Sequence, residues 1–423
     1  MRIVWVNHAS FIVESGPVRL ICDPWLEGSA FNDGWSLLSP TKLGYEEFGE
    51  ITHIWFSHEH PDHFSPGNLR KIPELHRHKI KVLFHNTKDK QVINLCKALG
   101  FSTEELPDNQ FVGIADDFKV FSVRQGLVDS CLAIFAEGKT LLDMNDCIFD
   151  TRSELEKIQR HIGKTDVLFS QFSYANWVGN PGDHAAHLRE ANRKRQEMEK
   201  QIRLFAPSVF VPFASFVYFS HAENFFMNEH VNRITDVYDF VTGDLKVPTN
   251  VLYPGDQWEV GRTWDSAPSI ARYKSDFDRA LAWPPQTSPP VSLVDLQEAA
   301  RVFIGKCAQK NNRLLLNALP PAAVRITDLG VHTELSFRRG LVETKSKRPD
   351  IELSSSSLSY CFKTDWGGET LQINGRFEVP PRGKPRRFFR IFRVPRHNGY
   401  GSSLNFRFLG RQVLQKVRGA VQN

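Results

Sequence analysis

The residues best suited to chemistry stand together in the segment Ser57-His58-Glu59-His60-Pro61-Asp62-His63. His58 and His60 are two positions apart, so in an extended segment their side chains point the same way and can bind one cation. Asp62 and His63 follow a turn later and are placed to bind a second cation. Imidazole and carboxylate ligands favour Zn, Fe, Mn or Co over Ca or Mg. The spacing therefore predicts two divalent transition-metal ions (Zn, Fe or Mn), with a histidine-rich surface loop as the alternative.

Predicted elements on both sides position this motif. A strand at 51–56 precedes it, and Ser65-Pro66 then supplies a helix cap and a first-turn proline for a helix to about residue 72. Other β-type runs alternate with helical stretches at 89–99 and 183–205. These runs lie at 2–6, 11–13, 18–22, 80–84, 118–123, 132–135, 140–143 and 209–211. We therefore expect an α/β catalytic domain over residues 1–262.

The remainder of the chain has a different pattern. Residues 263–291 contain four prolines close together and are predicted to be a proline-rich linker with a short helix. Residues 292–423 are predicted to form an α+β accessory domain, which opens with a helix capped by Ser292 and Asp295. Within it, Asn374-Gly375 predicts a hairpin between strands at 371–373 and 377–379.

The order His-x-His-x-Asp-His after a strand resembles the metallo-β-lactamase superfamily. That resemblance implies an αββα sandwich with the metals at one edge of the stacked sheets. Asn7-His8-Ala9-Ser10-Phe11, followed by Asp23-Pro24-Trp25-Leu26, is similar to the branch that contains L-ascorbate-6-phosphate lactonase and N-acylphosphatidylethanolamine phospholipase D. Residues 23–31, Asn145-Asp146-Cys147 and Ser220-His221 also resemble the catalytic portion of the CMP-N-acetylneuraminate hydroxylase family.

The resemblance also implies ligand roles. His58 and His60 match the first metal site, and Asp62 and His63 match the second. Asp146, which follows the predicted strand at 140–143, matches the carboxylate that bridges the two metals; a turn aspartate is the alternative. Asp62 and Asp146 are thus the expected catalytic carboxylates.

Further positions match the family near the metals. His221 matches the last histidine of the second site, with a plain loop histidine as the alternative and His184 as a competitor. His8 and Asp23 are expected to hold a ligand imidazole or the substrate by hydrogen bonds, unless they only cap strands. Aromatic residues flanking the stretches that lead to the site are expected either to stack on a substrate ring or to pack in the core. They are Phe172, Tyr174, Trp177, Phe216, Tyr218 and Phe219.

One ligand typical of the superfamily is missing. Its dinuclear hydrolases usually carry a histidine on the loop between His63 and Asp146, but residues 122–130 contain none. Gln125 or Asp129 can take its place, and His85 is a more remote substitute. Mixed histidine and carboxylate sites with open positions suit non-haem iron and O₂ chemistry. The chain lacks the Cys-x-His and Cys-x-x-His spacing of a Rieske centre, so an oxygenase of this kind needs electrons from a separate partner.

The charge is unevenly distributed. The chain has 53 Lys and Arg against 48 Asp and Glu, yet residues 381–423 contain eleven basic residues and no acidic one. A uniformly basic coat for nucleic acid is thereby excluded, and nucleic acid is an unlikely partner. Arg386, Arg387, Arg390 and Arg393 alternate with aromatic residues and are candidate anion-binding residues, or the solvated face of a packed strand. Residues 413–417 are typical of a basic amphipathic helix that lies on a membrane. The favoured alternative for the whole basic end is a positive flank that docks on the acidic catalytic domain or on a partner.

Compartment signals are few. No apolar run approaches the roughly 20 residues of a membrane-spanning helix, and the N-terminus becomes polar too early for a signal peptide. Six cysteines lie far apart and include no Cys-x-x-Cys pair. We therefore expect a reducing, cytoplasmic location.

Three functions remain open. The favoured one is a hydrolase in which metal-activated hydroxide attacks a phosphodiester, lactone or amide. The second is a non-haem iron oxygenase that hydroxylates a nucleotide sugar or a related small molecule. The third is a non-catalytic protein that binds polyanions or membranes. Both enzyme hypotheses expect a small-molecule substrate, and the basic tail favours an anionic one.

Overall fold

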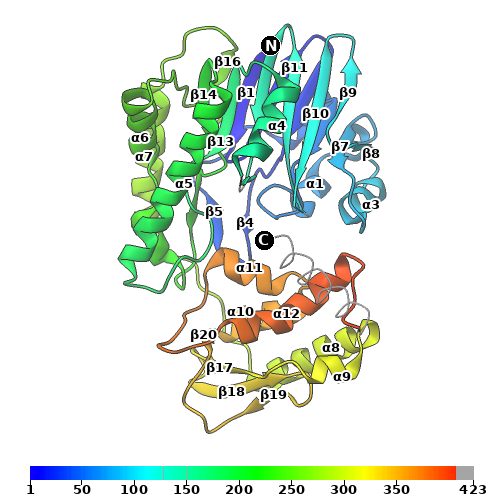
Figure 1. Ribbon diagram of the computed structural model, residues 1–423, viewed down its shortest axis with the longest axis vertical. Helices are drawn as coiled ribbons and strands as arrows, with labels where there is room; N and C mark the ends of the chain where they lie inside the picture. The colour runs from blue at the N-terminus through cyan, green and yellow to red at the C-terminus, as the bar shows by residue number, and fades with distance from the viewer. Residues whose placement is uncertain (127, 150, 406–423) are drawn as a thin grey trace.

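Two β-sheets stack face to face in the first part of the molecule, with helices on their outer faces (Figure 1). The structure is a computed structural model that describes residues 1–126, 128–149 and 151–405. The first sheet has the order β16-β1-β2-β3-β6-β7-β8, and the second has the order β10-β11-β12-β13-β14. The first contains β1 (Arg2–Asn7), β2 (Ser10–Ser15), β3 (Val18–Cys22), β6 (His53–Phe56), β7 (Lys81–His85), β8 (Ser102–Leu106) and β16 (Gln257–Glu259). The second contains β10 (Phe118–Gln125), β11 (Asp129–Ala136), β12 (Lys139–Asp143), β13 (Val167–Gln171) and β14 (Val209–Phe213), and β9 (Gln110–Ala115) lies beside β10.

Alternation along the strands explains why the sheets stack. On β1, Ile3 and Trp5 pack in the core between the two sheets, whereas Val6 faces the helices on the outside. Full burial of each such side chain contributes about 1.5–3 kcal/mol. Both faces of the first sheet are therefore covered, and the predicted αββα sandwich of α/β class is confirmed.

Helices cover the outer faces of the sandwich. α3 packs on β7 and β8, and α4 and α5 bury Ile158, Met198 and Ile202 against the second sheet. The cap predicted at Ser65 is present, because its hydroxyl accepts a hydrogen bond from the Asn68 amide. The elements are η1 (Tyr45–Glu50), α1 (Pro66–Lys71), α2 (Glu74–Arg77), α3 (Gln91–Ala98), α4 (Arg152–Ile162), α5 (His184–Phe205), η2 (Phe225–His230), α6 (Ile234–Asp239), η3 (Phe240–Asp244) and α7 (Ala267–Ala282).

Residues 263–291 differ from a plain linker. They contain the 16-residue helix α7, whose Tyr273, Phe277 and Ala280 are buried in the core between the two sheets. The proline-rich connection that follows is therefore confined to residues 283–290. We call residues 1–282 the N-terminal unit and residues 291–405 the C-terminal unit, because each has its own hydrophobic core.

The C-terminal unit consists of a small sheet of order β19-β18-β17-β20 covered by helices, as the α+β prediction expects. Figure 1 shows α11 and α12 on the side that faces the N-terminal unit. Its elements are α8 (Leu293–Lys310), α9 (Arg313–Asn317), β17 (Ala322–Ile326), β18 (Val331–Ser336), β19 (Gly340–Glu343), β20 (Ile351–Leu353), α10 (Ser355–Lys363), α11 (Gly367–Asn374) and α12 (Arg386–Gly399). A third small sheet, of β4 (Ser29–Ala30), β5 (Trp35–Leu37) and β15 (Val217–Phe219), belongs to the N-terminal unit.

Two local predictions in the C-terminal unit are wrong. Asn374-Gly375 forms no hairpin: Asn374 ends α11, and Gly375, at φ +68°, donates its amide to the Leu371 carbonyl as a left-handed helix cap. The arginine-rich segment from Arg386 is a helix rather than a strand. The amphipathic helix predicted at 413–417 lies outside the described residues. Within the described part of the chain, no helix combines the length and apolar character needed to cross a bilayer.

Candidate metal centre

The candidate site lies where parallel strands of both sheets end. β3, β6 and β7 run parallel, so their carboxyl ends open at one edge, where Asp23 follows β3 and His58 follows β6. In the second sheet, β12, β13 and β14 are also parallel, and their ends carry Asp146 and Gln171. Side chains that are up to 148 positions apart in sequence are thereby gathered at one edge of the sandwich.

A first group of potential metal ligands contains His58, His60 and Asp129. Their donor atoms lie within 4.8 Å of one another. His58 Nε2 is 2.8 Å from His60 Nδ1 and 3.9 Å from Asp129 Oδ1. Asp129 is the first residue of β11 and was one of the alternatives for the missing histidine. Gln125 instead donates its side-chain amide to the Ile148 carbonyl.

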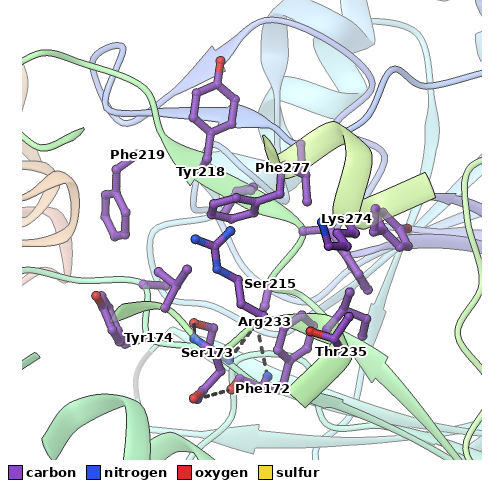
Figure 2. A pocket seen from close by; sticks show the side chains of 18 of the residues that line it. Phe172, Ser173, Tyr174, Ser215, Tyr218, Phe219, Arg233, Thr235, Lys274 and Phe277 are labelled. Carbon is purple, nitrogen blue, oxygen red and sulfur yellow. Dashed lines mark hydrogen bonds between the residues drawn. The ribbon is translucent and has the colours of Figure 1, made fainter. Parts of the chain in front are cut away.

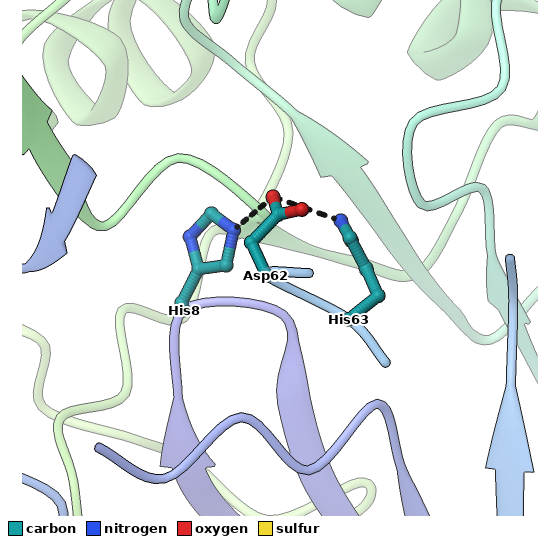
Figure 3. Close-up of side chains that lie close together, drawn as sticks. All are labelled: His8, Asp62 and His63. Carbon is teal, nitrogen blue, oxygen red and sulfur yellow. Dashed lines mark ion pairs between the residues drawn. The ribbon is translucent and has the colours of Figure 1, made fainter. Parts of the chain in front are cut away.

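A second group contains His8, Asp62 and His63. Figure 3 shows the two imidazoles on either side of the Asp62 carboxylate. Asp62 Oδ2 is 3.4 Å from His8 Nε2 and 3.2 Å from His63 Nε2. Asp146 Oδ2 lies 3.5 Å from His63 Nε2 and 4.0 Å from His58 Nε2, so this carboxylate stands between the two groups. His8, expected only to support the ligands, is thus placed among them.

Asp23 forms the buried base of the site. Its carboxylate is fully buried and accepts hydrogen bonds from the Ser57 amide at 2.8 Å, the Ser57 hydroxyl at 2.6 Å and Asn145 Nδ2 at 2.7 Å. It also lies 2.9 Å from His63 Nδ1. A hydrogen bond from Nδ1 leaves the lone pair of Nε2 free to face the shared space.

The electrostatics of the site fit a bound cation. Burial and the neighbouring Asp146 carboxylate raise the pKa of Asp129 to about 7. Burial and the neighbouring imidazoles of His63 and His60 hold the pKa of His58 well below its ordinary value. Asp62 Oδ1 is buried and has no hydrogen-bond partner among the described residues. A divalent cation would offset the cost of burying these carboxylates and coordinate the neutral imidazole, so the donor set fits a transition metal.

Three other histidines considered as ligands lie outside these groups. His221 Nε2 is 3.1 Å from the Ser288 hydroxyl, and its loop is joined to Gln286 at the unit junction. His184 contacts His230 at the start of α5. His85 is buried at the end of β7, where burial lowers its pKa to about 4. None of the three belongs to the groups around His58 and His63 in the described part of the chain.

Lys194 is a site residue that sequence reasoning missed. It lies on α5 with 6% of its surface exposed, and its ammonium donates to Gln171 Oε1. Gln171 Nε2 in turn donates to Asp146 Oδ1 at 3.0 Å. In sequence, Lys194 is one of many charges on a charge-rich helix, so no local signal distinguishes it. Only the packing of α5 against β13 turns its side chain inward.

These residues line a cavity of about 170 Å³. Its wall includes His60, Asp62, Asp129, Asp146 and Lys194, together with Ile373 from α11 of the C-terminal unit. The cavity therefore presents potential metal ligands and a cation to one small volume and is closed in part by the second unit.

A second cavity, of about 160 Å³, adjoins the first, since Trp35 and Ala175 line both. Figure 2 shows the Arg233 guanidinium among aromatic rings there, and it lies 3.4 Å from the ring centre of Phe277. Five of the six aromatic residues considered for ring stacking line this cavity, and they are Phe172, Tyr174, Phe216, Tyr218 and Phe219. The sixth, Trp177, stacks on Phe377 of the C-terminal unit instead.

The candidate anion-binding arginines lie on α12. Phe388 and Phe392 bury its apolar face, while Arg386, Arg390 and Arg393 are exposed. Arg387 forms an ion pair of 3.5 Å with Asp350. None of these arginines lines the metal-site cavity.

Comparison with known proteins finds a family match in the first part of the chain. Residues 2–120 match the family model described as a β-lactamase superfamily domain. The protein from Danio rerio named cytidine monophosphate-N-acetylneuraminic acid hydroxylase is 25% identical over 251 residues, which cover 54% of this chain and 40% of the relative. The resemblance of this part of the chain to the β-lactamase superfamily, a superfamily of metal-dependent enzymes, is confirmed, and so is the resemblance to the hydroxylase family.

Two further similarities were found. A protein of Mycolicibacterium smegmatis named "Putative Rieske 2Fe-2S iron-sulfur protein" is 26% identical over 231 residues, which cover 49% of this chain and 42% of that protein. The matched regions thus span only about two fifths of both relatives. The crystal structure of CmlA, a diiron β-hydroxylase from Streptomyces venezuelae, aligns with a TM-score of 0.43 and 14% identity, covering 61% of this chain and 54% of CmlA.

Proposed function

We propose that this chain is a non-haem iron oxygenase that hydroxylates a small anionic molecule, such as a nucleotide sugar or a related compound. One observation carries the proposal: Asp129 stands beside His58 and His60, where hydrolases of the superfamily have a third imidazole. Two histidines and one carboxylate with open positions form the ligand set that suits Fe(II) and O₂. A relative named as a hydroxylase supports the same choice.

The two groups and the carboxylate between them would hold two metal ions. His58, His60 and Asp129 would bind one ion, and Asp62 and His63, with His8 beside them, would bind the other. Asp146 is placed to bind both ions. Iron bound there would supply the redox chemistry that activates O₂.

The protein's own groups would orient the ligands and the substrate. Asp23 fixes the ring of His63 through Nδ1, and the Gln171 amide holds Asp146 through Oδ1, the oxygen that does not face the imidazoles. Lys194 presents a positive charge to the same cavity, where an anionic group of the substrate would bind. The adjoining aromatic cavity with Arg233 would accept a planar ring.

Electrons would come from a separate partner protein. The chain contains no Rieske cysteine and histidine spacing, and all six cysteines are buried and unpaired. The relative named as a Rieske protein suggests the chemical type of such a donor.

A metal-dependent hydrolase is the second candidate. Asp62 and Asp146 both line the cavity, where they would flank a metal-bound water. This arrangement favours attack on a phosphodiester, lactone or amide, and it needs no electron donor.

Iron oxidation tests the choice. Metal-free protein is loaded with Fe(II) without oxygen, freed of excess iron and mixed with O₂ while absorbance reports oxidation. We expect the native protein and an Asp116→Asn control, in which an exposed carboxylate is changed, to retain and oxidise the iron. Asp129→Asn should retain at least about tenfold less iron. Two results together would favour the hydrolase instead. The iron in the native protein would stay reduced, and the Zn-loaded protein would cleave members of a panel of phosphodiesters, lactones and amides.

A further inference from the structure

A second cluster of metal-binding side chains lies where α5 begins and η2 ends. His184 is the first residue of α5, and Glu229 and His230 are the last two residues of η2. Their donor atoms lie within 4.8 Å of one another. His187, one turn further along α5, is buried with its ring centre 5.9 Å from that of His230. Two separate segments of the chain thus bring imidazoles and a carboxylate to one point.

The distances match those between ligands of one metal ion. His184 Nδ1 is 2.9 Å from His230 Nε2 and 3.5 Å from Glu229 Oε2, and His230 Nε2 is 3.6 Å from Glu229 Oε1. Ligands at about 2.0–2.2 Å from a tetrahedral Zn²⁺ are separated by about 3.3 Å. A hydrogen bond between the two imidazoles explains the first distance alone. It does not explain why a carboxylate approaches both rings from the adjacent position.

The cluster is separate from the candidate metal centre. None of its residues lines the cavity that contains His60 and Asp146. Its members are also more open, because the side chains of His184 and Glu229 are 55% and 58% exposed. An ion bound there would keep a coordination position open to solvent, and water can fill it.

We propose that His184, Glu229 and His230 bind one Zn²⁺ or a similar divalent transition metal, independently of the catalytic metals. Two imidazoles and one carboxylate suit zinc and disfavour calcium or magnesium. The ion joins the first turn of α5 to the end of η2. Since α5 carries Lys194 into the catalytic cavity, the proposed ion fixes the end of the helix that positions this lysine. Its role is structural.

The test uses variants of the 423-residue chain and zinc alone. In a His58→Ala/His60→Ala/Asp62→Asn/His63→Ala background, which removes ligands of both catalytic metals, we expect one equivalent of bound zinc to remain after dialysis, measured by elemental mass spectrometry. Adding His184→Ala and His230→Ala should remove that equivalent and abolish the rise in melting temperature on zinc addition. Adding His76→Ala and His78→Ala, the histidines at the end of α2, should change neither measurement.

Glu229→Gln keeps both imidazoles and is the variant least expected to disturb folding. It should weaken zinc binding by at least about tenfold. Equal zinc content and equal zinc-dependent stabilisation with and without His184 and His230 would overturn the proposal. A failure of His58→Ala/His60→Ala/Asp62→Asn/His63→Ala to lower the metal content would reject the catalytic assignment and leave the α5–η2 site standing, so the two outcomes are distinguishable.

Discussion

Replacement of Asp23 by asparagine should uncouple the metal centre from its buried support. The carboxylate is fully buried at the end of β3 and has four polar partners, one of which is His63 Nδ1. Asparagine has the same shape and tolerates the positive φ of +40° found at this position. The substitution therefore removes charge and acceptor capacity with little change in packing.

The expected loss in the free energy of unfolding follows from the hydrogen bonds of Asp23. Oδ2 accepts from the Ser57 hydroxyl and Asn145 and lies 2.9 Å from His63 Nδ1, while Oδ1 accepts from the Ser57 amide. An amide NH₂ in place of Oδ2 would face the donors of His63 and Asn145, and the flipped amide would face the Ser57 N–H. A hydrogen bond to a charged group contributes about 1.5–3 kcal/mol. With two such bonds lost, the free energy of unfolding should fall by about 3–6 kcal/mol.

Metal affinity should fall as well, because His63 loses the partner that fixes its ring. Loss of such a partner typically weakens metal binding by about 10- to 100-fold. Urea denaturation of the metal-free protein measures the first effect, and competition with a chelator measures the second. Asp33→Asn is the matched control, since Asp33 also has a positive φ, of +58°, but is exposed. If Asp23→Asn behaved like this control in both assays, the role assigned to Asp23 would be wrong.

Three further substitutions test other parts of the structure. Burial lowers the pKa of His85 to about 4, against about 6.5 in the unfolded chain. The free energy of unfolding of the metal-free protein should therefore decrease by up to about 3 kcal/mol as the pH falls from 6.5 to 4. In urea denaturation, His85→Gln should show a weaker pH dependence than the native protein. Gly375→Ala places a Cβ 2.6 Å from Met227 Sδ at φ +68°, so thermal denaturation should show at least about 1 kcal/mol of destabilisation. Phe392→Ala leaves a cavity at a buried position in the C-terminal core. It should lower the free energy of unfolding by about 3–5 kcal/mol. An unchanged urea midpoint would contradict the burial of Phe392 in that core.

The parts of the site that could be predicted are those encoded locally or by motif. The segment from His58 to His63 carries its own spacing between a strand and a capped helix, so both ends of the loop are fixed by short-range signals. Asp129 was one of several open alternatives, because the loop contains two candidate donors and the sequence does not reveal which one turns inward. Gln125 and Asp129 are paired across the β10–β11 hairpin, so their side chains share one face. The hydrogen bond of Gln125 to the Ile148 carbonyl, a contact between distant segments, leaves Asp129 as the donor beside His58.

The wrong predictions arise where one signal has two meanings. Asn-Gly favours a tight hairpin, but glycine at positive φ also ends helices. Here Gly375 ends the helix α11. The segment from Arg386 has apolar residues at 388, 389, 391 and 392, which give one buried helix face on the C-terminal core. Short apolar runs of this kind are ambiguous between strand and helix until the surface they pack against is known.

The junction between the units links the charge distribution to the site. Although the C-terminal end is basic, the cation that fastens the two units is Arg376, whose side chain is fully buried and pairs with Glu223 at 2.8 Å. Arg376 also donates to the Asn32 carbonyl, on the loop that carries Phe31 into the catalytic cavity. A buried pair of this kind contributes little net stability, whereas removal of one partner costs about 3–5 kcal/mol. The pair therefore serves mainly to fix the relative position of the units, and with it the position of Ile373 over the metal ligands. The C-terminal unit is accordingly a wall of the candidate metal site, and the exposed arginines of α12 lie outside that cavity.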